Sequence, residues 1–80
     1  MKFRVDVMPR KEALDPQGRT VLGSLKRLGF QNAQDCRVGR VIEVEVQTSD
    51  RTQGEKEVRE MADKLLHNPL IETYSVSFLA

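Results

Sequence analysis

The sequence contains no tryptophan and few of the residues from which many functional sites are built. Its 80 residues include one cysteine, Cys36, one histidine, His67, and one tyrosine. A single cysteine excludes an internal disulfide, a CxxC redox pair and a thiolate zinc site. We expect Cys36 to be a small buried hydrophobic residue and not a reactive thiol.

An excess of charge of one sign is also missing. Thirteen Lys and Arg residues against 12 Asp and Glu residues leave a net charge of +1, which gives no basis for long-range attraction to nucleic acid or anionic lipid. An RNA-binding sheet would also need exposed aromatic side chains, whereas Phe3, Tyr74 and Phe78 all fall on the predicted inward face. The sequence therefore predicts no nucleic-acid partner.

Long hydrophobic runs are absent as well. The longest are a few residues, far short of the roughly 20 that a membrane-spanning helix needs, and the first residues, MKFRVDV, alternate instead of forming a signal-peptide core. We expect a cytoplasmic protein with no membrane partner. Residues 1–80 make one domain, and because so short a chain buries little surface, we expect it to associate with itself or with others.

What the sequence does contain is regular apolar spacing. Residues 2–8 alternate between polar and apolar, which is typical of a half-buried strand, and Pro9 ends it. In ALDPQG, at 13–18, Asp15 is the expected N-cap of a helix and Pro16 its first residue, so replacing Asp15 should destabilise the domain. Gly29 should end that helix in a left-handed conformation. Its apolar positions are Val21, Leu22, Leu25 and Leu28.

The segment AQDCRVGRVIEVEVQT predicts two strands joined at Gly39. A two-residue loop would place the apolar side chains of the two strands on opposite faces. A three-residue loop, 39–41, instead pairs Val38 with Ile42 and Cys36 with Val44, while Arg37 meets Glu43 on the other face. We therefore predict the three-residue loop or an equivalent bulge.

A second helix and a last strand complete the pattern. Thr52 and Glu55 form a capping-box pattern at the start of the helix, and Asn68-Pro69 closes it. The apolar stripe of this helix is Val58, Met61, Ala62, Leu65 and Leu66, and the inward side chains of the last strand are Tyr74, Val76 and Phe78.

The order of elements is βαββαβ. It predicts an α+β fold, a two-layer ferredoxin-like sandwich in which two helices cover one face of an antiparallel sheet. The first and third strands are then neighbours, and the outer face carries Arg4 and Asp6 beside Glu43 and Glu45. Because the signs alternate, we predict cross-strand ion pairs there and not a metal or acid-base site.

No catalytic motif is present. The chain has no phosphate-binding GxxxxGKS loop, no HExxH pair and no nucleophile elbow. His67, near the end of the second helix, is expected to be structural. The Arg10-Lys11 loop precedes a helix N-terminus that could bind an anion, but Asp15 would compete for the same N–H groups. We expect no catalytic residues, no cofactor site and no metal site in this chain.

Four blocks carry a family resemblance: ALDPQG, LGF at 28–30, RVGR at 37–40 and LLHNPLIETY at 65–74. Their order and spacing over nearly the whole chain resemble the PurS family, the small subunit of phosphoribosylformylglycinamidine synthase, also called formylglycinamide ribonucleotide amidotransferase. Three positions depart from the family pattern: Arg40, where lysine is common, His67, where a small residue often lies, and Thr73, where an acidic residue is frequent.

The resemblance implies a non-catalytic subunit of a carbon–nitrogen ligase complex of de novo purine (IMP) biosynthesis that uses glutamine as amido donor. It implies a large synthetase subunit that binds ATP and Mg, and a glutaminase subunit that supplies ammonia. A PurS-like protein would bridge the two as a homodimer, with a tetramer also open. From exposure and charge, the residues predicted to dock the partners are Arg10, Lys11, Asp15, Gln17, Arg37 and Arg40.

Two other functions fit the βαββαβ order. One is a regulatory module resembling ACT domains, which bind small molecules near the first strand–helix loop. The other is an acylphosphatase-like enzyme, but the sequence has Pro9-Arg10-Lys11-Glu12 where that family has a glycine-rich GxVQGVxFR loop.

Overall fold

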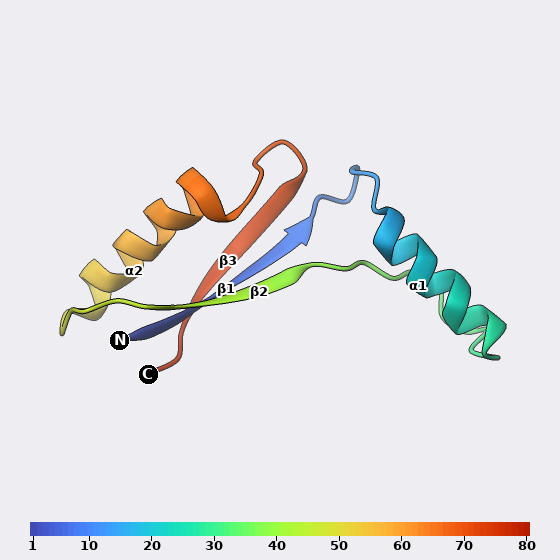
Figure 1. Ribbon diagram of the computed structural model, residues 1–80, viewed down its shortest axis with the longest axis horizontal. Helices are drawn as coiled ribbons and strands as arrows, with labels where there is room; N and C mark the ends of the chain where they lie inside the picture. Colours follow the sequence, from blue (N-terminus) through green and yellow to red (C-terminus); the bar gives the residue numbers. More distant parts are fainter.

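The computed structural model describes residues 1–80 as a three-stranded antiparallel sheet with one helix packed on it and another beyond its end (Figure 1). The sheet order is β2-β1-β3. The molecule is elongated, with extents of 49 × 26 × 13 Å. The elements are β1 (Lys2–Pro9), α1 (Pro16–Arg27), β2 (Arg40–Glu45), α2 (Arg51–Met61), the π-helical turn η1 (Ala62–Leu66) and β3 (Glu72–Phe78).

The core is built around the central strand β1. Its alternate side chains, Phe3, Val5 and Val7, have no exposed surface. The register places Val5 between Ile42 of β2 and Val76 of β3, so the apolar faces of all three strands coincide. Helix α2 covers this face with buried Val58 and Ala62. The predicted faces of these strands, and the prediction that the first strand neighbours the strand after Gly39, are therefore confirmed.

The start of α2 differs from the prediction. The capping box of Thr52 and Glu55 does not form, because Asp50 lies one residue before the helix and its Oδ1 accepts hydrogen bonds from the backbone N–H groups of Thr52, at 3.0 Å, and Gln53, at 3.4 Å. A carboxylate at this position satisfies two of the free donors of the first turn. Glu55 instead approaches Arg59 at 3.9 Å.

The apolar stripe predicted for the second helix is only partly buried. Val58 and Ala62 are buried, but Met61 is 38% exposed and Leu65 82%. Leu65 lies in η1, and because a π turn holds more residues than an α turn, it rotates the following side chains relative to the α-helical stripe. None of the helices is long and apolar enough to cross a membrane.

The hairpin predicted at Gly39 does not form within the chain. Residues 34–39 pair with no strand and continue the line of β2 away from the sheet (Figure 1). The chain crosses the end of β1 here so closely that a Cβ on Gly39 would lie 2.2 Å from the carbonyl oxygen of Val7. The backbone N–H of Val38 is bound by Asp15 instead of a neighbouring strand. The strand predicted for 33–38 and its three-residue loop are therefore wrong within a single chain, and so are the pairs of Val38 with Ile42, Cys36 with Val44 and Arg37 with Glu43.

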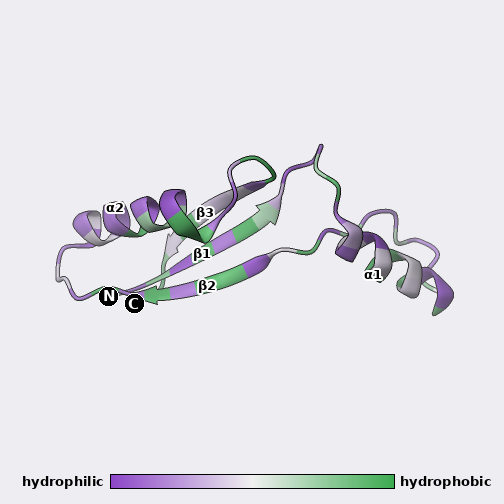
Figure 2. Cartoon of the chain, turned by 45° about the horizontal axis from the view of Figure 1, so that its top comes forward, coloured by the Kyte–Doolittle hydropathy of each residue, from purple (hydrophilic) through white to green (hydrophobic).

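Helix α1 lies beyond the end of the sheet, whereas α2 lies over it (Figures 1 and 2). Its cap is as predicted, with Asp15 before Pro16. Its end is also as predicted, because Gly29 has a φ of +104° and the N–H of Phe30 donates to the carbonyl oxygen of Leu25 at 3.0 Å. The α+β ferredoxin-like class is confirmed, with α1 and residues 33–38 standing apart from the sheet as one arm.

The outer face of the sheet is charged, as predicted, but its ion pair runs along a strand. Arg4 lies opposite Glu43 in the register, yet its Nε donates to Asp6 Oδ1 of the same strand at 2.8 Å. The prediction of cross-strand pairs is therefore wrong in direction, because the residue two positions along the strand lies on the same face within reach.

The contact between α2 and the sheet depends on Gly54. A Cβ at this position would lie 2.9 Å from Cε2 of Phe3 and 3.2 Å from Cγ2 of Thr48. We predict that Gly54→Val lowers the free energy of unfolding by about 1–3 kcal/mol through overpacking, measured by urea titration. Gly23→Ala in α1 is the control, because its new methyl group would have only Arg27 nearby, at 3.7 Å. Equal stability of Gly54→Val and the unsubstituted protein would contradict this account of the contact.

Candidate docking surface

Asp15 joins the start of α1 to the segment before β2. Its Oδ1 accepts from the N–H of Gly18 at 3.0 Å and its Oδ2 from the N–H of Val38 at 3.0 Å. These bonds, from Gly18 first and then Val38, hold the pKa of Asp15 below its ordinary value of 3.8, assisted by the charge of Arg37. The side-chain capping was predictable from ALDPQG. The bond to Val38 was not, because nothing in the sequence relates two residues 23 positions apart.

Three of the predicted docking cations surround one shallow hollow. Arg10, Lys11 and Arg37 line a volume of about 290 Å³ together with Pro9, Glu12 and Thr73. Arg10 is held in place because its Nε donates to the carbonyl oxygen of Pro69 at 3.0 Å. The three ion pairs of the chain involve other residues. The three cations of this cationic hollow therefore form no ion pair within the chain, and the carboxylate of Glu12 shares its lining.

A second hollow adjoins the first and shares Lys11 and Arg37 with it. Its volume is about 360 Å³, and it adds Asp15, Arg19 and Asp35 to the lining. Both carboxylates are bound to backbone N–H groups, since Asp35 Oδ1 accepts from Cys36 at 2.9 Å. Arg19 was missed by sequence reasoning, although its position four residues after Asp15 indicates that it lies on the same side of α1.

The remaining predicted docking residues lie in different surroundings. Gln17 is exposed on the first turn of α1. Arg40 is not brought into the cationic hollow: its guanidinium donates to both carboxylate oxygens of Glu72, at 2.5 and 3.1 Å, and to the carbonyl oxygen of Leu66 at 2.8 Å. This pairing raises the pKa of Arg40 and, as the largest cause, lowers that of Glu72. Arg40 braces β2 against β3 and η1, and its role in docking stays a prediction.

His67 has structural contacts. Its Nδ1 lies 2.7 Å from the carbonyl oxygen of Ala62, and its ring centroid lies 4.7 Å from that of Tyr74. The hydroxyl of Tyr74 donates to Asp63 Oδ1 at 2.7 Å, and this bond raises the pKa of Tyr74. The cluster ties η1 to β3. Nowhere in the chain do three or more His, Cys, Asp or Glu side chains gather closely enough to hold a metal ion.

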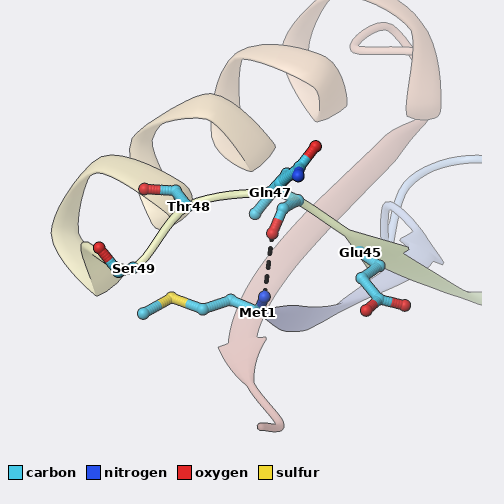
Figure 3. Close-up of a pocket in the computed structure, with 6 residues that line it drawn as sticks. Met1, Glu45, Gln47, Thr48 and Ser49 are labelled. Atoms are coloured by element: carbon cyan, nitrogen blue, oxygen red, sulfur yellow. Dashed lines mark hydrogen bonds between the residues drawn. The ribbon is translucent and has the colours of Figure 1, made fainter.

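A wider hollow of about 610 Å³ lies at the opposite end of the sheet (Figure 3). The amino group of Met1 donates to the carbonyl oxygen of Val46 at 2.9 Å, and the N–H of Val46 donates back to the carbonyl oxygen of Met1 at 2.8 Å. Gln47, Thr48 and Ser49 form much of its rim. Sequence reasoning missed this hollow. Its backbone bonds extend the pairing of β1 with β2, which is a structural role.

The profile of the PurS family, described as phosphoribosylformylglycinamidine (FGAM) synthase, matches residues 2–80. The chain belongs to the PurS family. Its relatives include the FGAM synthase subunit PurS of Mycobacterium leprae, 40% identical over 73 residues that cover 91% of this chain and 89% of that protein. The PurS subunit of Bacillus subtilis is 38% identical over 73 residues, covering 91% and 86%.

Solved PurS structures share the arrangement of elements. The PurS subunit of Thermotoga maritima matches with a TM-score of 0.89 at 31% identity, covering 98% of this chain and 90% of that chain. A chain of the structure described as PurLQS from Thermotoga maritima matches with a TM-score of 0.88 at 31% identity, covering 98% and 95%. The family resemblance read from the four blocks is confirmed, and the ACT-like alternative is not favoured.

Asp15 accepts two hydrogen bonds from backbone N–H groups, so its replacement should destabilise the fold. Asp15→Ala should lower the melting temperature at neutral pH by several degrees, because two N–H groups lose their acceptor. Asp15→Asn is the matched control, since its amide oxygen can still accept a hydrogen bond from Gly18, whereas its amide nitrogen cannot accept one from Val38. Melting temperatures of all three proteins measure the effect.

The stabilisation by the Asp15 carboxylate should depend on pH. Because folding lowers the pKa of Asp15 below 3.8, the carboxylate's contribution is fully present above that value and is lost as the pH falls through the lower, folded-state pKa. The advantage of the unsubstituted protein over Asp15→Asn should therefore shrink below about pH 3.8. A constant difference from pH 7 to pH 2 would contradict the assignment.

Proposed function

We propose that this chain is the non-catalytic subunit that bridges the synthetase and glutaminase subunits of an FGAM synthase complex in purine biosynthesis. In this role it holds the two active sites together so that ammonia passes from one to the other. ATP and Mg belong to the large synthetase subunit, no cofactor is bound by this chain, and the complex works in the cytoplasm. The observation that supports the proposal most is the similarity over 98% of the chain to a chain of the PurLQS structure.

The surface of the chain suits a bridging subunit. Arg10, Lys11 and Arg37 form no ion pair within the chain. Large apolar side chains are exposed just outside the two ends of α1, at Leu14 and Leu28, and on the turn before β3. Unpaired charges at a rim and exposed apolar anchors are what protein interfaces combine. We propose that acidic surfaces of the partner subunits dock at the cationic hollow, and that Asp15 and Gln17 contribute beside it.

Reconstitution with the other two subunits tests the bridging role. Glutamine-dependent formation of the amidine should fall at least about tenfold when this chain is left out, because the two active sites are then no longer held together. Synthesis from added ammonium should change much less, and this comparison is the control. Equal glutamine-dependent rates with and without the chain would overturn the proposed function.

We also propose that the chain acts as a homodimer in which each arm is exchanged. The apolar stripe of α1 has no sheet to cover, and β2 is an edge strand with unpaired backbone groups, which is a template for another strand. Residues 33–38 of a second copy can pair with β2, so that the predicted matches of Val38 with Ile42 and Cys36 with Val44 form between chains. Opening of a hairpin at a hinge is the usual origin of such an exchange.

Leu25 tests the dimer. It lies on the apolar stripe of α1 and is half-buried in the single chain. Leu25→Asp should raise the dissociation constant of the dimer by more than about tenfold, because a charge would be buried in the interface. Lys26→Asp is the matched control, since it adds the same carboxylate one position along, off the apolar stripe. Light scattering over a concentration series gives both constants, and an undiminished Leu25→Asp dimer would contradict the exchange.

A further inference from the structure

The register of the arm-exchanged dimer decides which residues of the two copies face each other at its centre. Val38 pairs with Ile42 of the second copy, and Cys36 pairs with Val44 of the second copy. These pairs are symmetric about residue 40, so residues 34–46 of the two copies run antiparallel. The two-fold axis of the dimer then passes beside Arg40, which lies directly opposite Arg40 of the second copy.

The two arginine side chains stand on the same face of the shared sheet. Arg40 lies opposite Val7 in the register of β1 and β2, so it belongs to the inner face with Ile42 and Val44. The Cβ atoms of directly opposite residues in antiparallel strands are about 4.5–5.5 Å apart, and like charges at such a position are destabilising. An Arg40 without a counter-charge would therefore oppose the exchange.

Glu72 supplies that counter-charge from within each copy. Its Oε2 accepts from Nη1 of Arg40 at 2.5 Å and its Oε1 from Nη2 at 3.1 Å, while Nη2 also donates to the carbonyl oxygen of Leu66 at 2.8 Å. Glu72 is itself held by the backbone N–H of Asn68, at 2.7 Å. Because Glu72 lies on β3, across β1 from β2, it draws the guanidinium away from the edge at which the second copy arrives.

The other charged pairs of this register are also balanced. Arg37 meets Glu43 of the second copy, which has the opposite sign. Asp35 meets Glu45 of the second copy, which has the same sign, but each Glu45 lies opposite Lys2 within its own sheet. Each place where the exchange opposes like charges therefore has an opposite charge beside it, and at the two-fold axis that charge is Glu72.

We propose that Glu72 is a positioning residue of the dimer: it neutralises Arg40 and turns it inward, so that a second copy of this chain can pair along β2. This role rests on the arm-exchanged dimer proposed above and adds the residue that makes its centre electrostatically acceptable. Without the carboxylate, the guanidinium groups of the two copies would face each other uncompensated at the axis.

The dimer dissociation constant, measured by light scattering over a concentration series, tests this role. Glu72→Gln keeps the size of the side chain and removes its charge, so it should raise the constant by at least about tenfold, and added salt should reduce that factor. Glu60→Gln is the matched control, because Glu60 is exposed on α2 and forms no ion pair. It should dimerise as the unsubstituted chain does.

Substitution of Arg40 separates repulsion at the axis from bracing within one chain. Arg40→Gln should raise the dissociation constant by less than about threefold, since only an exposed ion pair is lost. Combining it with Glu72→Gln should restore the dimer to the level of Arg40→Gln, because no charge then stands at the axis. Equal weakening by both single variants, with no recovery in the double variant, overturns the role of Glu72 as a counter-charge.

A cross-link tests the register itself. Val44→Cys should form a disulfide with Cys36 of the second copy, because directly opposite residues lie within the Cα range of a disulfide. Within one chain the two positions lie about 26 Å apart along an extended segment, so the bond can form only between copies. Glu43→Cys is the matched control, since it points to the other face. Non-reducing electrophoresis gives the result.

The outcomes distinguish the dimer from the role of Glu72. A monomeric unsubstituted chain overturns the arm-exchanged dimer and the counter-charge with it. A dimer in which Val44→Cys forms no cross-link overturns the register, and so the place of Arg40 at the axis. A cross-linked dimer whose affinity is unchanged in Glu72→Gln overturns the counter-charge alone and leaves the exchange standing.

Discussion

The central strand β1 is the constraint on which the rest of the structure depends. Both of its edges are used, by β2 and β3, and Phe3, Val5 and Val7 are completely buried under α2. The register of both neighbouring strands follows from the need to bring their apolar side chains to the same face as these three. With α2 packed there, nothing within the chain holds α1 against the sheet, and α1 remains with residues 33–38 through Asp15.

The sequence predicted those parts of the fold that depend on local chemistry or strand alternation. Asp15 and Pro16 start α1 and Gly29 ends it, because capping and a positive φ are decided by neighbours in the chain. The start of α2 was wrong because two capping signals overlap, and Asp50 reaches the free N–H groups of the first turn. The hairpin at Gly39 was wrong because alternation gives the register that two strands would have but not whether they pair, and the N–H of Val38 donates to Asp15 instead.

The candidate surface was predictable in its charges and not in its shape. Arg10 and Lys11 are adjacent in the chain, but Arg37 joins them only because residues 35–38 are held beside α1 by Asp15. Arg40 resembles the other cations in the sequence, yet Glu72 lies within reach across the sheet and engages it.

The small core bears on the amount of this protein that a cell can maintain in the folded state. Only eight of 80 residues are buried, so the burial of apolar side chains within the single chain contributes little to the free energy of folding. By mass action, binding to the folded form alone raises its stability with the concentration of the partner. Copies made in excess of their partners would spend more time unfolded and be degraded first, which would match the amount of the subunit to the amount of complex without a separate control.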